Sequence, residues 1–329
     1  MKRILAVSVA EKKADFEIKK PGQLRELRRA KVRPYLRGLV QGLNRRNHQL
    51  GKDYIIHFRQ RRDVTTAGTF DLPHPSDPCL VFCTSTTVVR AAASVFPPTV
   101  PAPGSPIPIV GIVSEPGPPP TGEGFDTIAN ICGVSAKRSQ TADECFNRFF
   151  RTVPTIKQLK VLHKPGYGPS IRALSLVQAA ATAKGVTATQ MDASSVAQLE
   201  SALDGLTERD PDKDPDPTVG VQILPVDLFL GHAQEIIDLV QGEKKLPTFF
   251  PVPDWVKPDV SSALGAYGVS QRRCGQLMAE RVDAIWKANN TVPAAGRWVF
   301  APEEAFEFVA SAAAAEELNI ELYPSIPRV

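Results

Sequence analysis

The stretch from Leu80 to Ala92, LVFCTSTTVVRAA, decides the fold. Its four apolar residues up to Cys83 are typical of a strand that is covered on both faces, as in a parallel sheet. The hydroxyl residues 84–87 follow, and the segment after them predicts a helix with one apolar face. Ligands of open α/β sheets lie at the carboxyl ends of strands, and helix starts bind anions, so this turn is a candidate site. The alternative is an ordinary capped turn, because Ser and Thr are common N-caps.

Length and composition indicate a soluble globular chain of two domains. The chain has 329 residues, of which 43% are hydrophobic and 22% charged. The net charge is only +4, and much of the positive excess lies in basic pairs before residue 63. These pairs lack interleaved aromatic residues and any helix-turn-helix or zinc-finger spacing. We therefore expect a solvated basic face and no nucleic-acid partner.

The five cysteines, Cys79, Cys83, Cys132, Cys145 and Cys274, are scattered along the chain. Cys79 and Cys83 would lie roughly 13 Å apart on a strand, which exceeds the reach of a disulfide bond. No C-x-x-C or Cys/His pair has the spacing of metal ligands. The sequence therefore predicts no disulfide framework, no metal site and no cofactor.

The first ten residues resemble a signal peptide, with two charges before an apolar segment. They are shorter than the usual 15–30 residues, and charged residues follow at once. We interpret Ile4 to Val9 as the first strand, with any signal peptide missing from this chain. No run approaches the roughly 18 apolar residues of a membrane helix.

Predicted strands and helices alternate along the chain. The predicted strands cover residues 4–9, 54–58, 80–83, 109–113, 131–135, 159–163, 186–191, 218–224, 246–251, 263–268 and 298–300. The predicted helices include residues 36–43, 171–183, 195–206, 233–240, 270–288 and 302–317. Residues 11–33 form a charged segment, and residues 97–108, 114–124 and 207–217 form Pro-rich loops. This order predicts an α/β protein with parallel sheets in two doubly wound lobes.

Short motifs occur along the chain in a recognisable order. They are GLVQGL (38–43), GKDYII (51–56), CTST (83–86), IPIV (107–110), VSEP (113–116), GVS (133–135), LPVD (224–227), LP (246–247) and AYG (266–268). Because of these motifs, the sequence resembles the ABC-transporter substrate-binding proteins of the type I periplasmic-binding-protein fold. The resemblance extends from about residue 37 to residue 327. The resemblance is to the branch that includes tryptophan and phenylalanine binders.

The resemblance implies two Rossmann-like lobes that are joined by a hinge of several segments and hold a ligand in the cleft between them. Lobe I would contain residues 1–116 and 253–300, and lobe II residues 117–252. The lobe of the C-terminal segment 301–329 is left open.

The resemblance also implies the residues that bind the ligand. Lobe I would contribute Thr84, Ser85, Thr86, Ser114 and Glu115, lobe II would contribute Pro165, Ser170 and Asp227, and Tyr267 would lie near the cleft. Hydroxyl and N–H groups suit a carboxylate, and Glu115 or Asp227 suits an ammonium group. Asp227 as a helix cap and Tyr267 as a core residue remain alternatives.

Three departures from the family pattern concern the ligand. Glu115 stands where the family usually has Asp, and His163-Lys164-Pro165 stands where it has Tyr-Asn-Pro. The basic segment 11–33 enlarges the first loop. An anionic or more polar ligand than an ordinary amino acid is therefore possible.

The function that the resemblance implies is the solute-binding component of an ABC uptake transporter. Such a protein would be an extracytoplasmic monomer, and its partners would be a small molecule (an amino acid or related carboxylate) and the membrane permease subunits. The alternative is a soluble ligand-sensing regulator of the same fold in the cytoplasm. An enzyme is disfavoured because the sequence has no G-x-S-x-G, Walker A or G-x-G-x-x-G motif.

Overall fold

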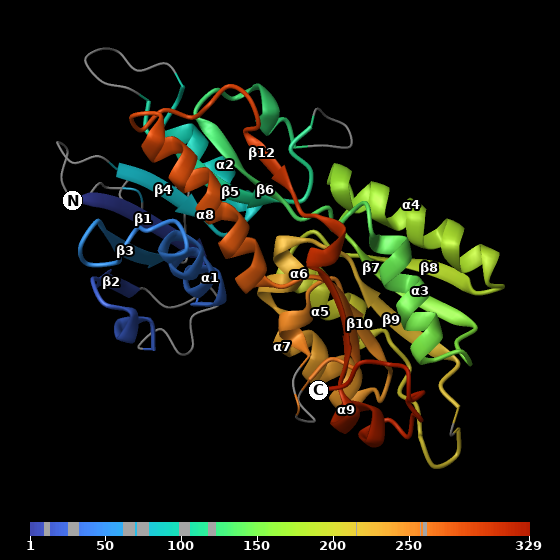
Figure 1. Cartoon of the computed structure of the whole chain (residues 1–329). Helices are drawn as coiled ribbons and strands as arrows, with labels where there is room; N and C mark the ends of the chain where they lie inside the picture. The colour runs from blue at the N-terminus through green and yellow to red at the C-terminus, as the bar shows by residue number, and fades with distance from the viewer. Residues whose placement is uncertain are drawn as a thin grey trace. The chain divides into compact units, whose positions relative to one another are not determined.

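The chain forms two units, each of which is built from two separate segments of the sequence. The computed structural model describes residues 1–9, 14–25, 33–61, 70, 79–98, 106–117, 123–214, 216–256, 258 and 262–329. Unit 1 is formed by residues 1–136 and 271–301, and unit 2 by residues 137–270 and 302–329. The chain therefore passes between the units three times, after residues 136, 270 and 301. Each unit has one mostly parallel sheet with helices packed on it (Figure 1), which confirms the predicted fold class.

Unit 1 contains a seven-stranded sheet. Its strands, in spatial order, are β12 (Trp298–Phe300), β6 (Ile131–Ser135), β5 (Ile109–Val113), β4 (Cys79–Cys83), β1 (Lys2–Val9), β3 (Tyr54–Arg61) and β2 (Ala14–Ile18). Neighbouring strands are parallel except β2 and β3. The apolar run ending at Cys83 is β4 in the middle of this sheet, and Val81 and Phe82 are fully buried, as its composition predicts.

Helices cover both faces of this sheet. The helix α2 (Thr86–Val95) packs on the face that carries Val81 and Cys83. The helix α8 (Gln271–Lys287) packs on β5 and β6 and against α1 (Arg33–Asn44). Figure 1 shows α8 in orange running beside these strands. The sheet is thereby buried on both sides, which explains why its central strands are continuously apolar.

Unit 2 contains a six-stranded sheet. Its strands, in spatial order, are β13 (Phe306–Ala310), β11 (Gly265–Val269), β10 (Thr248–Phe250), β9 (Val219–Ile223), β7 (Gln158–His163) and β8 (Thr187–Asp192). Its helices are α3 (Ala142–Thr152), α4 (Gly168–Ala183), α5 (Val196–Asp204), α6 (Asp227–Gly231), α7 (Ala233–Ile236), the π-helix η4 (Ile237–Glu243) and α9 (Ala312–Glu317). Neighbouring strands are parallel except β11 and β13.

The two faces of this sheet have separate cores. Phe146 and Phe149 of α3 pack with Phe249 on one face. On the other face Phe229 of α6 packs with Phe250. Phe249 and Phe250 are successive residues of β10, and successive side chains of a strand point to opposite faces. One short strand therefore anchors both cores.

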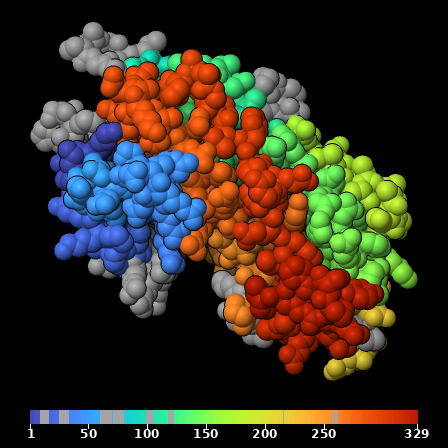
Figure 2. All heavy atoms as spheres, viewed as in Figure 1, coloured from blue at the N-terminus to red at the C-terminus, as the bar shows by residue number. Residues whose placement is uncertain are grey.

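The C-terminal segment differs from its prediction. A helix was predicted over residues 302–317, but Phe306–Ala310 is the strand β13 and only Ala312–Glu317 is helical as α9. The alternation of Phe306, Glu307 and Phe308 has the period of a strand, and the Phe306 ring stacks on Tyr267 with centroids 5.7 Å apart. This segment packs on unit 2, where Arg209 donates to the Leu318 carbonyl at 3.0 Å. In Figure 2 it is the dark red mass beside the yellow residues of that unit.

The unit boundaries also differ from the predicted lobes. Residues 117–136 belong to unit 1, because β6 pairs with β5. Residues 253–270 belong to unit 2, because β11 pairs with β10. The segment 301–329, for which the sequence predicts no lobe, lies in unit 2 except for residue 301. Composition does not reveal these crossings, since they depend on which strands pair.

Parts of the predicted loops and of the basic segment lie outside the described residues. These are residues 10–13, 26–32, 99–105, 118–122 and 215. Within the described part of segment 11–33 lies β2, a strand that the charged sequence did not indicate. It pairs antiparallel with β3 at one edge of the sheet.

A charged cluster fastens α8 to the residues that follow α1. The Asp283 carboxylate, in a residue only 7% exposed, lies 2.9 Å from His48 Nε2 and 2.9 Å from Lys287 Nζ. Burial raises the pKa of Asp283, but the hydrogen bonds from His48 and Lys287 outweigh it and hold the pKa below its ordinary value. Ionised Asp283 therefore stabilises the folded state.

The Asp283→Asn variant is expected to lose about 1–3 kcal/mol of unfolding free energy at pH 7. Because the pKa of Asp283 is lower in the folded than in the unfolded chain, this stabilisation is present above about pH 4 and is lost as the pH falls through the folded pKa. Urea denaturation at pH 7 and at pH 3 measures the difference. The control is Glu280→Gln, whose carboxylate is more exposed and is expected to matter by less than about 0.5 kcal/mol. A deficit of equal size at both pH values would contradict this role.

Candidate functional site

Unit 1 carries hydroxyl groups at the carboxyl edge of its sheet. Cys83 of β4 is in register with Gly111 of β5, so Thr84 and Ser114 follow neighbouring parallel strands. Both residues are buried, at 9% and 7% exposure. The Ser114 carbonyl accepts a hydrogen bond of 2.9 Å from the Ser135 hydroxyl at the end of β6. Three adjacent strands thus end in hydroxyl residues at the edge where ligands of α/β sheets lie.

The start of α2 faces this same edge of the sheet. Ser85 is the N-cap, with φ −156° and ψ 161°, and its Oγ accepts from Val88 N at 3.4 Å. Ser85 is half-buried and Thr86 is buried. The first N–H groups of a helix have no acceptor within the helix and, with the helix dipole, attract anions. That this turn of hydroxyl residues binds a carboxylate stays a prediction.

Two buried carboxylates follow β5. Glu115 and Glu123 are each 6% exposed, and Glu115 N donates to Glu123 Oε2 at 3.2 Å. Glu123 N in turn donates to the Glu115 carbonyl at 2.9 Å, which closes the base of the loop. Glu123 was not predicted, because a Glu after a Pro-rich loop looks like a solvated residue. The pair places two acidic side chains beside the hydroxyl edge.

Unit 2 gathers its predicted residues at the corresponding edge. The registers of β7, β9, β10 and β11 place His163, Leu224, Pro251 and Tyr267 in one row across the sheet. Pro165 lies two residues after His163 in the sequence, and Asp227 lies three residues after Leu224. Asp227 is half-buried and is the first residue of α6. Four predicted site residues lie in unit 2, and three of them, Pro165, Asp227 and Tyr267, are within a few residues of this row.

Ser170 and Tyr267 are engaged in contacts of unit 2. The Ser170 hydroxyl is fully buried and accepts from Lys164 N at 3.0 Å, which holds the loop after β7. The Tyr267 ring stacks on Phe306, and the Arg148 guanidinium lies 5.6 Å from its centroid. Burial raises the pKa of Tyr267. Contact of either residue with a ligand stays a prediction.

One pair of this edge was missed by the sequence reasoning. His163 Nδ1 lies 3.0 Å from Asp192 Oδ1, and the two residues are in register at the ends of β7 and β8. They are separated by 29 residues in sequence. The available signal was that His163 ends one predicted strand and Asp192 directly follows the next.

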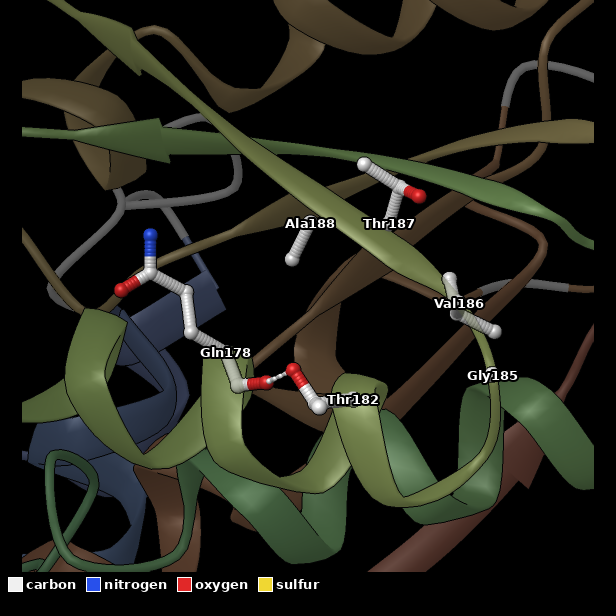
Figure 3. Close-up of a pocket in the computed structure, with 6 residues that line it drawn as sticks. All are labelled: Gln178, Thr182, Gly185, Val186, Thr187 and Ala188. Atoms are coloured by element: carbon white, nitrogen blue, oxygen red, sulfur yellow. Dashed lines mark hydrogen bonds between the residues drawn. The ribbon is translucent and has the colours of Figure 1, made fainter.

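Two surface depressions occur on unit 2. One, of about 460 Å³, is lined by Pro165, Asp192, Ser194, Gln198, Ser201 and Ala202 at the carboxyl edge. The other, of about 450 Å³, lies between the end of α4 and the start of β8 (Figure 3). Its Thr182 hydroxyl donates to the Gln178 carbonyl at 2.8 Å, and no charged residue lines it. The first depression is thus the one that adjoins the candidate residues.

Cys132 and Cys145 carry buried thiols. Burial raises the pKa of the Cys132 and Cys145 thiols to about 12, so they stay protonated at neutral pH. Within the described ranges no cluster of three or more His, Cys, Asp or Glu residues could hold a metal ion. Nor does any helix there have the length and apolar character needed to cross a membrane.

Comparison with sequence families gives no match, and no curated protein matches the sequence. Solved structures do match over the whole chain. An ABC domain in complex with L-Trp from Streptococcus pneumoniae is 15% identical, with a TM-score of 0.66 and coverage of 100% of both chains. The ligand-free, open structure of CD0873, a substrate binding protein with adhesive properties from Clostridium difficile, is 15% identical, with a TM-score of 0.57 and coverage of 100% of this chain and 99% of that one.

A third similar structure has another role. It is a probable maltose operon transcriptional repressor from Staphylococcus aureus, 12% identical, with a TM-score of 0.54 and coverage of 95% of this chain and 97% of that one. Binding proteins and transcriptional regulators thus share this architecture. With its two units, their strand orders and these neighbours, the chain has the type I periplasmic-binding-protein fold.

Proposed function

We propose that this protein is the solute-binding component of an ABC uptake transporter and takes up an amino acid or a related carboxylate. The observation that supports this best is the chemistry of the unit 1 edge. Hydroxyls and the start of α2 suit a carboxylate, and the Glu115 and Glu123 pair beside them suits an ammonium group. A zwitterion needs both within one small site.

In this proposal the protein closes when the solute binds, and the closed protein is recognised by membrane permease subunits outside the cytoplasm. A hinge motion of this kind is stabilised by contacts that form only in the closed state. Three segments connect the units here, which suits such a motion. Binding without catalysis is part of the proposal, supported by neighbours that are binding proteins and regulators.

The second candidate is a cytoplasmic ligand-sensing regulator. The repressor among the similar structures favours it, since the same fold serves that role there. Cell fractionation with an antibody against the chain separates the two candidates. Recovery outside the cytoplasm supports the transporter role, and recovery only in the cytoplasm supports the regulator.

A thermal-shift screen of amino acids, small carboxylates and aromatic acids tests the proposed function. A solute that binds only the folded state stabilises it by about 2.7 kcal/mol at a hundredfold excess over its Kd. A melting temperature that rises with the concentration of one of these solutes would support the proposal. No shift with any of them would overturn the amino-acid assignment.

The Ser85→Ala variant is expected to weaken binding of the solute found in that screen by about tenfold, because one hydrogen bond to a charged group is worth about 1.4 kcal/mol or more. It also removes an N-cap, which costs about 1 kcal/mol of stability. The control is Ser311→Ala, which removes the N-cap of α9 next to the opposite edge of the unit 2 sheet. Calorimetry should show full affinity for Ser311→Ala and reduced affinity for Ser85→Ala. Equal affinities would exclude Ser85 from the site.

A further inference from the structure

His163 has one ring nitrogen that the fold does not use. The residue is 6% exposed at the end of β7, and Nδ1 is bonded to Asp192. Its Nε2 is buried and has no hydrogen-bond partner among the described residues. Leaving a buried polar atom without a partner costs about 1–3 kcal/mol, so a bound water, ion or ligand is expected to complete it.

The bond to Asp192 determines what Nε2 can do. An ionised carboxylate only accepts hydrogen bonds, so Nδ1 must carry the proton. In the neutral ring Nε2 then has a lone pair and accepts. The bond made by one ring nitrogen sets the role of the other, as in carboxylate–histidine pairs that orient a metal ligand. A lone pair of this kind accepts a hydrogen bond from an O–H or N–H donor.

The surroundings of the pair are suited to a polar solute. Asp192 itself lines the depression of about 460 Å³, together with Ser194 and Gln198. Lys164, the next residue after His163, is half-buried with its Nζ 6.0 Å from the Tyr167 ring centroid. A solute in this depression would therefore meet Asp192, which is bonded to His163, together with Ser194 and Gln198.

We propose that His163 Nε2 accepts a hydrogen bond from a donor group on the solute, with Asp192 fixing the tautomer. The assignment rests on the proposed function and narrows its substrate class. It selects amino acids or related carboxylates that carry a hydroxyl, amide or ring N–H in addition to the amino and carboxylate groups. A site built to bond such a group disfavours the analogue that lacks it, because the buried acceptor is then left unpaired.

Calorimetry with pairs of solutes that differ by one donor tests the assignment. The probes are L-tyrosine against L-phenylalanine and L-serine against L-alanine. The wild type is expected to bind the donor-bearing member of one pair about tenfold more tightly or better. The Asp192→Asn and His163→Leu variants should lose this preference, since Asn can donate to Nδ1 and shift the proton to Nε2, and Leu has no acceptor. The matched control is Glu235→Gln, which alters the other carboxylate–histidine pair of this unit, at His232, and should keep the preference.

The outcomes separate this assignment from the proposed function. If a solute binds but its preference is unchanged in both variants, the role of His163 is refuted and the solute-binding function stands. If the wild type binds none of the probes, the assignment falls together with the amino-acid class. Long-range nitrogen-15 NMR of the imidazole rings tests the tautomer without any solute. It should show protonated Nδ1 and bare Nε2 for His163 at pH 8, and protonated Nε2 at that pH would also refute the proposal.

Discussion

Replacing Gly38 by valine is expected to lower the unfolding free energy by about 3 kcal/mol. A Cβ atom at Gly38 would lie 1.9 Å from the Arg272 carbonyl oxygen and 3.0 Å from Gln276 N. Both are backbone atoms of α8, which cannot move aside as a flexible side chain would. The helices are equally close at Gly275 of α8, where an added Cβ atom would lie 2.1 Å from the Tyr35 carbonyl oxygen of α1. Forcing α1 and α8 apart opens the packing on one face of the unit 1 sheet.

Urea denaturation followed by circular dichroism measures this loss. The milder Gly38→Ala variant serves if the valine variant does not fold, because it places the same Cβ atom. The control is Gly22→Ala in the same unit, where no atom lies within 4 Å of the added Cβ. A Gly38 variant as stable as the Gly22 variant would show that the two helices do not pack as described.

Replacing Phe249 by alanine is expected to cost about 3–5 kcal/mol. Its ring is fully buried and stacks on Phe149 with centroids 4.9 Å and planes 15° apart. A Cβ atom at Gly265 would lie 2.1 Å from the ring, so the ring packs directly against β11 where that strand has no side chain. Loss of the ring leaves a cavity between α3 and the sheet that rigid backbone cannot fill.

Differential scanning calorimetry should show a fall of roughly 10 °C in Tm for Phe249→Ala, since 1 kcal/mol corresponds to about 2–4 °C in a domain of this size. The control is Tyr323→Ala, a ring in the same unit that is 54% exposed. Its Tm should change by about 2 °C or less. Similar shifts for the two variants would mean that the core of unit 2 is not centred on β10.

The sequence predicted the elements whose pattern is local. The strand before Thr84 and the helix after it are found as β4 and α2, because four apolar residues and a hydroxyl cap are signals within one short window. The strand Phe306–Ala310 was missed, because Glu303, Glu304 and the alanines around it favour a helix. Its strand conformation comes from pairing with β11, a contact between segments far apart in the chain.

The candidate site likewise contains residues that the local sequence identifies and residue pairs that only the fold brings together. The hydroxyl residues 84–86 are contiguous and follow a strand, so the local sequence identifies them. The His163–Asp192 and Glu115–Glu123 pairs form only when strands or loop ends are brought together. No local pattern specifies which two of the many charged residues meet, so these pairs required the fold.

Isothermal titration calorimetry of the solute selected by the thermal-shift screen tests the central claim, binding without turnover, most directly. The account predicts a single transition with one solute per chain, and heat that returns to the dilution baseline after saturation. A steady heat signal after saturation would reveal turnover and contradict the binding-protein assignment. The absence of any binding heat would contradict the site itself.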